Sequence, residues 1–325
     1  MARITNGTVW KSLSNLIILI CCVLPGGLLE LIATPSTSFQ RGFYCNDESI
    51  RYPYKDSTFS TLLSFILCLG IPLLFMLIIE FLLYNRFDCL GEPQRDVPSH
   101  RGVKILCLKV HSYLAALFAG YTPFLFAGGM TLSMTNVLKY MVGRLRPHFL
   151  SVCQPDFAMI QCKDSNGYYI YVEDFQCSAE ANISTLLDAR LSFPSGHAAS
   201  AASSFIYLAI YLQFRMVWNS PYLLKPFIQS LLVAFAMIIS ASRVSDFKHF
   251  FSDVFCGFFL GTAIAVFVAF FVSDLYYFES PSNLKEKAST DFVGSRTDTD
   301  LSTIVSIPAN YKSTESSDGR KPTNI

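Results

Sequence analysis

Residues 254–273, VFCGFFLGTAIAVFVAFFVS, form a run of 20 residues without a charged side chain, bounded by Asp253 and Asp274. The hydrocarbon core of a bilayer is about 30 Å thick, and a helix needs roughly 20 mainly apolar residues to cross it. Backbone polar groups cannot stay unpaired in lipid, which favours a helix over an open strand here. The run therefore predicts a transmembrane helix.

Further stretches of similar length also lack charge, and together they predict an all-α polytopic membrane protein with six transmembrane helices. These stretches hold 18, 23, 27, 17 and 17 residues and cover residues 12–29, 57–79, 112–138, 198–214 and 226–242. We expect a cytoplasmic N-terminus over residues 1–11, a six-helix domain over residues 12–275 and a cytoplasmic tail over residues 276–325. The tail is rich in Ser, Thr, Asp and Asn without a helical period, which predicts disorder.

The composition agrees with a membrane protein. Of the 325 residues, 52% are hydrophobic and 15% are charged, whereas a soluble globular chain carries about 25% charged residues. The net charge of +1 lacks the basic excess that is typical of nucleic-acid-binding proteins, and we expect no such partner.

The first hydrophobic segment has two interpretations. Arg3 and Lys11 precede the apolar residues 16–24, and Pro25, Gly26 and Gly27 then interrupt them. The segment is either the first transmembrane helix or a secretory signal peptide. The topology of the later helices is the same in both cases.

The distribution of Lys and Arg predicts the orientation in the membrane, because cytoplasmic loops carry more of both. Five such residues lie between the second and third helices: Arg86, Arg95, Arg101, Lys104 and Lys109. Three lie between the first and second: Arg41, Arg51 and Lys55. The N-glycosylation sequon at Asn182 then falls outside the cytoplasm, whereas a competing sequon at Asn6 would be cytoplasmic and unused.

Eight of the ten cysteines fall into two groups. Four fall in the two larger predicted outer loops, where an oxidising environment permits two disulfides in any of three pairings: Cys45, Cys153, Cys162 and Cys177. Four others lie within predicted helices, where we expect buried thiols: Cys21, Cys22, Cys68 and Cys256. No Cys and His spacing in the sequence indicates a zinc site, and we predict no metal or cofactor.

Three polar clusters interrupt this apolar chain. They are KYMVGRLRP from Lys139 to Pro147, PSGH from Pro194 to His197, and Ser242-Arg243 followed by His249 and Asp253. In the six-helix topology these clusters meet at the extracytoplasmic ends of helices three to six. We therefore predict an active site at that end.

The residue types suit the transfer of a phosphoryl group. Lys139, Arg146 and Arg243 provide fixed positive charge, and arginine binds phosphate through paired hydrogen bonds. Ser195 and Gly196 stand at a predicted helix N-terminus, which favours an anion.

The two histidines of the clusters fit two steps of this chemistry. His249 and Asp253 are spaced i and i+4, so on one helix face the carboxylate would fix the imidazole tautomer for attack on phosphorus. His197 would protonate the departing alkoxide.

Each cluster also has a structural interpretation. The cations could be interfacial side chains that snorkel at helix ends, and Pro194 to Gly196 could be a turn with a helix cap. The pair of His249 and Asp253 could be an ordinary polar contact. We expect four neighbouring residues to be structural or to face the substrate: Arg144, His148, Asp246 and Lys248.

The order and spacing of the clusters resemble those of the lipid phosphate phosphatases, the membrane type 2 phosphatidic acid phosphatases. That family's pattern is Lys, six residues, Arg-Pro; then Pro-Ser-Gly-His; then Ser-Arg, five residues, His, three residues, Asp. All of its positions are matched here, and the resemblance covers about residues 12–275.

The resemblance implies a metal-independent phosphomonoesterase whose active site faces the extracellular side or an organelle lumen, with the plasma membrane as the expected location. It implies that His249 is a phosphohistidine nucleophile, Asp253 its partner and His197 the acid. The implied phosphate-binding residues are Lys139, Arg146, Ser195, Gly196 and Arg243. The implied substrates are phosphatidic acid, lysophosphatidic acid, sphingosine 1-phosphate and ceramide 1-phosphate, and the family also suggests a homo-oligomer.

Two other functional hypotheses remain at this stage, and a partner site at the C-terminal residues is a separate prediction. The protein could be a non-catalytic scaffold that binds lipid phosphates. It could be a transporter, because Glu30 and Glu80 lie in or near predicted helices, although we expect both to be solvated at helix ends. The chain ends in Thr323-Asn324-Ile325, a sequence that could add as a strand to a PDZ-type groove.

Overall fold

The computed structural model describes residues 6–32, 38–89, 104–105, 108–109, 112–178, 182–216 and 221–273. The chain divides into two compact units, Met1–Glu279 and Ser280–Ile325. The second unit lies outside the described residues, as does all but a small part of the loop between the second and third long helices. The expected disorder of the tail and its PDZ-type end therefore stay predictions.

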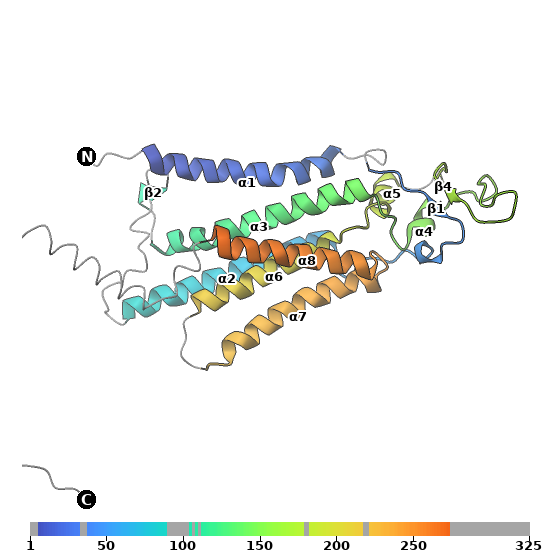
Figure 1. Cartoon of the computed structure of the whole chain (residues 1–325). Coiled ribbons are helices and arrows are strands. Elements are labelled where there is room, and N and C mark those ends of the chain that lie inside the picture. The colour runs from blue at the N-terminus through green and yellow to red at the C-terminus, as the bar shows by residue number, and fades with distance from the viewer. Residues whose placement is uncertain are drawn as a thin grey trace, which may run out of the picture. The chain divides into compact units, whose positions relative to one another are not determined.

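Among the described residues, long helices cover the six charge-free stretches of the sequence. They are α1 (Asn6–Ile32), α2 (Thr61–Cys89), α3 (Ser112–Val142), α6 (Gly196–Arg215), α7 (Leu224–Ser245) and α8 (Phe251–Phe267), which the π-helical turn η2 (Val268–Val272) extends. Figure 1 shows them running side by side, with α6 packed against α2, α3, α7 and α8. The expected all-α class is confirmed.

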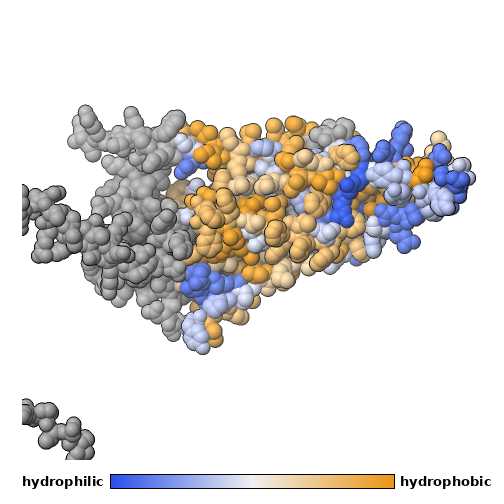
Figure 2. Space-filling view, viewed as in Figure 1, coloured by the Kyte–Doolittle hydropathy of each residue, from blue (hydrophilic) through white to orange (hydrophobic). Residues whose placement is uncertain are grey.

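Three helices in the described part of the chain are long and apolar enough to cross a membrane. They are Thr61–Leu83, Leu224–Ser245 and Phe251–Val272, and Leu13–Leu29 is a shorter apolar helix. Large apolar side chains of α8 are exposed, including Phe255, Phe259 and Phe267. Figure 2 shows hydrophobic residues over the helices and hydrophilic residues at the end that carries β1 and β4. Such an apolar surface is typical of a membrane protein, because lipid covers it there.

The hydrophilic end is built from the two segments that precede α2 and α6. They contribute β1 (Phe43–Tyr44), η1 (Glu48–Ile50), α4 (Phe149–Cys153), β4 (Tyr171–Val172) and α5 (Ile183–Ala189), and β1 pairs with β4 in antiparallel register. A further two-stranded pair, β2 (Lys104–Ile105) and β3 (Leu108–Lys109), lies before α3. The disulfides are Cys45–Cys162, which joins the two segments, and Cys153–Cys177, within the second one. The structure thus selects one of the three pairings that the sequence allowed.

The other cysteines are less buried than expected. Cys68 is buried, but Cys22 and Cys256 are only partly buried and Cys21 is exposed. The expectation of burial was wrong for Cys21, because its side chain lies on a helix surface that no other described element covers.

Glycines allow α6 and α8 to approach closely. A Cβ atom on Gly257 would lie 2.4 Å from the carbonyl oxygen of Ser195, and one on Gly261 would lie 2.0 Å from that of Ala199. Small residues four positions apart allow such close contact of helix backbones in membranes. This contact brings the start of α6 against the first turns of α8.

Helix α1 continues through Pro25, Gly26 and Gly27, where we expected an interruption. Its backbone carbonyls accept hydrogen bonds from α3, since Asn136 Nδ2 donates to the oxygen of Gly26 at 3.0 Å and Ser133 Oγ donates to that of Cys22. The neighbouring helix thus supplies polar partners near the proline. In this structure the first segment is an integral helix of the bundle.

Glu80 is buried, contrary to the expectation of a solvated acid. Its carboxylate accepts hydrogen bonds from Arg215 at 2.8 and 2.6 Å and from the hydroxyl of Tyr211, and only 4% of Glu80 is exposed. Sequence spacing gave no sign of the partner, which comes from the last turn of α6. This pairing ties α2 to α6 and gives Glu80 a structural role.

We predict that Gly261→Ala destabilises the bundle, because its new methyl group would overlap the Ala199 carbonyl. Overpacking of this kind costs about 1–3 kcal/mol, so the thermal unfolding midpoint of the detergent-purified protein should fall. Gly128→Ala is the matched control, since a Cβ there meets nothing within 4 Å. Equal midpoints for the two variants would contradict the proposed packing.

Candidate active site

The structure brings the three polar clusters together at one end of four helices. Lys139 lies in the last turn of α3, and Ser195 caps the N-terminus of α6. Arg243 lies in the last turn of α7, and Asp253 lies in the first turn of α8. Because α6 and α8 both begin here, two positive helix ends face the same region.

Asp253 connects all three clusters. Its carboxylate accepts hydrogen bonds from Arg144, from Ser192 Oγ at 2.6 Å and from the backbone N–H of Phe250 at 3.1 Å. Its backbone carbonyl accepts one from the N–H of Ser195 at 3.0 Å. Asp253 therefore fixes the start of α6 and the start of α8 relative to the segment after α3.

The structure does not record the expected direct contact between Asp253 and His249, both of which it describes. His249 Nδ1 lies 2.6 Å from the carbonyl oxygen of Ser192, whose hydroxyl donates to Asp253. The prediction of a shared helix face was wrong because α8 begins at Phe251, so His249 precedes the helix. Asp253 thus orients His249 through Ser192.

This contact defines the tautomer of His249. A carbonyl oxygen only accepts hydrogen bonds, so Nδ1 must carry the proton and Nε2 keeps its lone pair. Burial lowers the pKa of His249 well below its usual value, and the charges of Arg146 and Lys139 lower it further. The lowered pKa favours the neutral imidazole, the form that a nucleophilic role would require.

Three buried polar atoms near the site have no hydrogen-bond partner among the described residues: Nε2 of His197, Nε of Arg146 and Nε2 of His148. The first two belong to residues of the three polar clusters. Buried polar atoms normally have partners, so this pair indicates where a polar ligand binds. The Arg146 guanidinium also forms an ion pair with Asp188 through Nη2.

Glycine at position 196 lets a cation approach the start of α6. A Cβ atom there would lie 3.3 Å from Lys139 Nζ. The first N–H groups of a helix have no partner within it, and in the described part of the chain Ser195 Oγ accepts a hydrogen bond from the N–H of Ala198. The N–H groups of Gly196 and His197 and the Lys139 ammonium thus surround a position suited to an anion.

Snorkelling does not account for the arginines. Arg146 and Arg243 expose only 6% and 1% of their surface, whereas a snorkelling side chain places its charge in water. Arg144 and Asp246 take structural roles, because Arg144 pairs with Asp253 and Asp246 pairs with Arg243.

The segment before α2 covers the loop between α7 and α8, which carries His249. Tyr52 stacks on Phe247 with ring centroids 4.6 Å apart, and the Lys248 ammonium lies 3.7 Å from the ring centroid of Tyr54. Phe247 has a φ of 54°, a left-handed conformation that is costly for a bulky residue. The surrounding contacts must therefore hold this turn in place.

Sequence reasoning missed Ser192, Asp188 and Thr58 as parts of the site. Ser192 is three residues before the cap of α6, and Asp188 precedes it in α5. Thr58 comes from the segment before α2, and its hydroxyl donates to Asp246. A polar residue next to a motif is a weak signal, and Thr58 carried no signal at all.

Asn182, the predicted glycosylation site, is exposed at the N-terminus of α5. Its side-chain oxygen accepts a hydrogen bond from the backbone N–H of Ser184, the third residue of the sequon, at 2.9 Å. The position is accessible to a modifying enzyme, and the modification stays a prediction.

The apolar helices, with buried cations and two histidines at their ends, define the class of the protein. It is a membrane-embedded enzyme whose substrate carries an anionic group. Residues 120–277 match the model of the PAP2 superfamily. Phospholipid phosphatase 1 from Mus musculus is 35% identical over 279 residues, which cover 84% of this chain and 88% of that protein. Phospholipid phosphatase 2 from Homo sapiens is 32% identical over 283 residues, which cover 85% and 87%. A putative phosphatidate phosphatase from Drosophila melanogaster is 33% identical over 264 residues, which cover 81% and 68%.

No solved structure matches the chain. The chain belongs to the lipid phosphate phosphatase family of the PAP2 superfamily. It is a membrane phosphatase of lipid metabolism, which disfavours the non-catalytic scaffold and the transporter.

We predict that His148 makes the protein less stable in acid. Its pKa is lowered to about 4, mainly by burial and also by the charges of Arg146 and Lys248, against the raising effects of the Phe247 carbonyl and Asp188. The unfolded state then binds more protons between about pH 6.5 and 4, so stability falls as the pH falls through this window, by at most about 1.4 kcal/mol per pH unit.

The matched variant is His148→Asn, whose amide can still donate to the Phe247 carbonyl, which lies 2.7 Å from His148 Nδ1. Thermal midpoints measured from pH 7 to pH 4.5 should decline less steeply in the variant than in the wild type. Parallel declines would show that His148 does not contribute.

Proposed function

We propose that this protein removes the phosphate monoester from phosphatidic acid, lysophosphatidic acid, sphingosine 1-phosphate or ceramide 1-phosphate through a phosphohistidine on His249. The observation that carries the proposal is the hydrogen bond from His249 Nδ1 to the Ser192 carbonyl. It leaves Nε2 unprotonated within a cluster of buried cations.

In the first step, Nε2 of His249 attacks phosphorus and the bond from phosphorus to the lipid oxygen breaks. His197 acts here as an imidazolium, which the negative charge of the bound phosphate favours, and it gives its proton to the departing alkoxide, which is otherwise a poor leaving group. Negative charge on the equatorial oxygens is stabilised by Lys139, Arg146, Arg243 and the N–H groups at Gly196.

In the second step, His197 accepts a proton from water as the water oxygen attacks phosphorus. The bond between phosphorus and Nε2 breaks, and inorganic phosphate leaves. Both histidines then return to their starting protonation states. No metal ion takes part in this proposed sequence.

We assign Asp253 a positioning role in this mechanism. It holds Ser192, whose carbonyl holds the nucleophile, and it also neutralises Arg144. This replaces the direct partnership with His249 that the sequence predicted.

The proposed site faces the extracellular side or an organelle lumen, and the plasma membrane is the proposed location. Disulfides persist in oxidising compartments, and Cys45–Cys162 and Cys153–Cys177 lie on the same end of the unit as the site. The exposed sequon at Asn182 supports the same orientation. A homo-oligomer also stays a proposal, which rests on the family resemblance alone.

We predict that the purified protein releases phosphate from phosphatidic acid in the presence of a chelator, and that His249→Ala abolishes this activity. Loss of a nucleophile should cost on the order of a thousandfold or more in rate. His197→Ala should reduce the rate with phosphatidic acid more than with an aryl phosphate, whose leaving group needs little protonation. A His249→Ala protein with undiminished activity would contradict the mechanism.

We also predict that the protein expressed in animal cells carries a glycan on Asn182. Asn182→Gln should abolish the mobility shift that a glycan-removing enzyme produces, and Asn6→Gln should leave it unchanged. A shift that depends on Asn6 alone would place the active site in the cytosol.

A further inference from the structure

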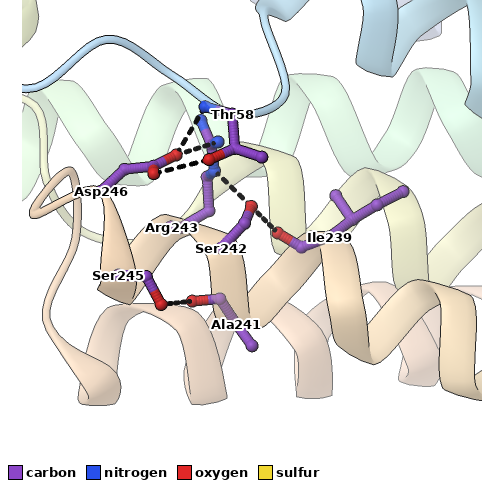
Figure 3. A network of polar contacts seen from close by, with 7 residues as sticks. All are labelled: Thr58, Ile239, Ala241, Ser242, Arg243, Ser245 and Asp246. Carbon is purple, nitrogen blue, oxygen red and sulfur yellow. Dashed lines mark hydrogen bonds and ion pairs between the residues drawn. The ribbon is translucent and has the colours of Figure 1, made fainter.

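Asp246 connects the segment before α2 to Arg243, which the proposed mechanism assigns to phosphate binding. Its Oδ2 accepts hydrogen bonds from the backbone N–H of Thr58 at 2.8 Å and from Arg243 Nη2 at 2.7 Å, and its Oδ1 accepts one from Thr58 Oγ1 at 2.8 Å. Figure 3 shows these three bonds converging on the carboxylate of Asp246, which lies between α7 and the segment that carries Thr58.

Arg243 donates a second hydrogen bond, from a different nitrogen of its guanidinium. Its Nε donates to Ser242 Oγ at 3.2 Å, so the recorded bonds occupy Nε and one hydrogen of Nη2. The remaining donors of the guanidinium stay available for phosphate. Only 1% of Arg243 is exposed, which strengthens each of its contacts because water screens them little.

The backbone of Arg243 also supports the loop between α7 and α8 that carries His249. Its carbonyl oxygen accepts hydrogen bonds from the N–H groups of Lys248 and His249 at 3.0 and 3.2 Å. A displacement of Arg243 would therefore reach both the phosphate position and the nucleophile.

The position of Thr58 limits how Asp246 can contact Arg243. An unrestrained carboxylate tends to bind a guanidinium through both oxygens. Thr58 donates its backbone N–H to Oδ2 and its hydroxyl to Oδ1. The bond from the hydroxyl keeps Oδ1 away from the arginine. Without the hydroxyl, Oδ1 would lose its donor, and the carboxylate would gain by turning toward a second guanidinium nitrogen that phosphate would otherwise use.

We propose that Thr58 is a positioning residue for phosphate binding, which acts through Asp246 to keep the Arg243 guanidinium open to the substrate phosphate. This rests on the proposed function, in which Arg243 binds phosphate. The proposal assigns the segment before α2 a role in catalysis that the three polar clusters of the sequence did not indicate.

The test compares Thr58→Val, which keeps the shape and the N–H but loses the hydroxyl, with Thr58→Ser, which keeps both donors. Thr61→Val is the matched control, because Thr61 is exposed and the structure records no side-chain contact for it. Full-length purified proteins are assayed with phosphatidic acid in detergent micelles. The readouts are kcat, KM, the inhibition constant of inorganic phosphate and the thermal midpoint.

The loss of one hydrogen bond is worth about 1 kcal/mol, or roughly a fivefold change in binding. Thr58→Val should raise KM and the inhibition constant of phosphate about three- to tenfold. Thr58→Ser should stay within about twofold of the wild type, as should Thr61→Val. In Asp246→Asn protein, adding Thr58→Val should cause a smaller further change than it does alone, because the two residues act through one network.

Two outcomes would overturn the inference alone. In one, Thr58→Val leaves the phosphate inhibition constant unchanged in an active protein. In the other, Thr58→Val and Thr58→Ser lose activity to the same degree and in step with a lower thermal midpoint, which indicates a purely structural role. A wild-type protein that neither releases nor binds phosphate would instead overturn the proposed function, and this inference with it.

Discussion

The Asp253 carboxylate has no exposed surface, so its negative charge must be compensated inside the protein. Burying an unpaired charge costs several kcal/mol, and the partners of Asp253 come from three separate parts of the chain. Arg144 follows α3, Ser192 and Ser195 precede α6, and Phe250 precedes α8. The fold reaches low energy only when these segments meet.

The close packing of α6 against α8 makes this meeting possible. Gly257 and Gly261 remove the side chains that would separate the two backbones at the level of Ser195 and Ala199. The N-termini of both helices then point toward one position. Backbone N–H groups, helix dipoles and buried cations add their positive potential there, in surroundings with little water to screen it. The same contacts that stabilise the bundle thus create a site for a phosphate ester.

The sequence predicted the long helices well because each one falls on a stretch without charged side chains. It also predicted the convergence of the three clusters, since the topology placed them at one end. It could not reveal the disulfide pairing or the partner of Glu80, which depend on contacts between distant segments. Among the described residues, three helices have the length and hydropathy of a membrane span, and Leu13–Leu29 of α1 is apolar but shorter.

The details of the candidate site show where sequence reasoning ended. The spacing of His249 and Asp253 suggested one helix face, but the helix starts after His249, and Ser192 links the two residues instead. Thr58 lies in a segment without any motif, and only folding brings it to Asp246. Charges and histidines are informative in an apolar chain because they are rare, whereas hydroxyl and backbone groups are common and become informative only in three dimensions.

The most direct test of the account is to search for the covalent intermediate on His249. Purified protein would be mixed with phosphatidic acid labelled in its phosphate, quenched within milliseconds in alkali, and analysed by peptide mapping. We predict a label that is stable in alkali and lost in acid, carried by the peptide that contains His249 and absent from His249→Ala protein. A label on another residue, or rapid turnover without any labelled protein, would contradict the account.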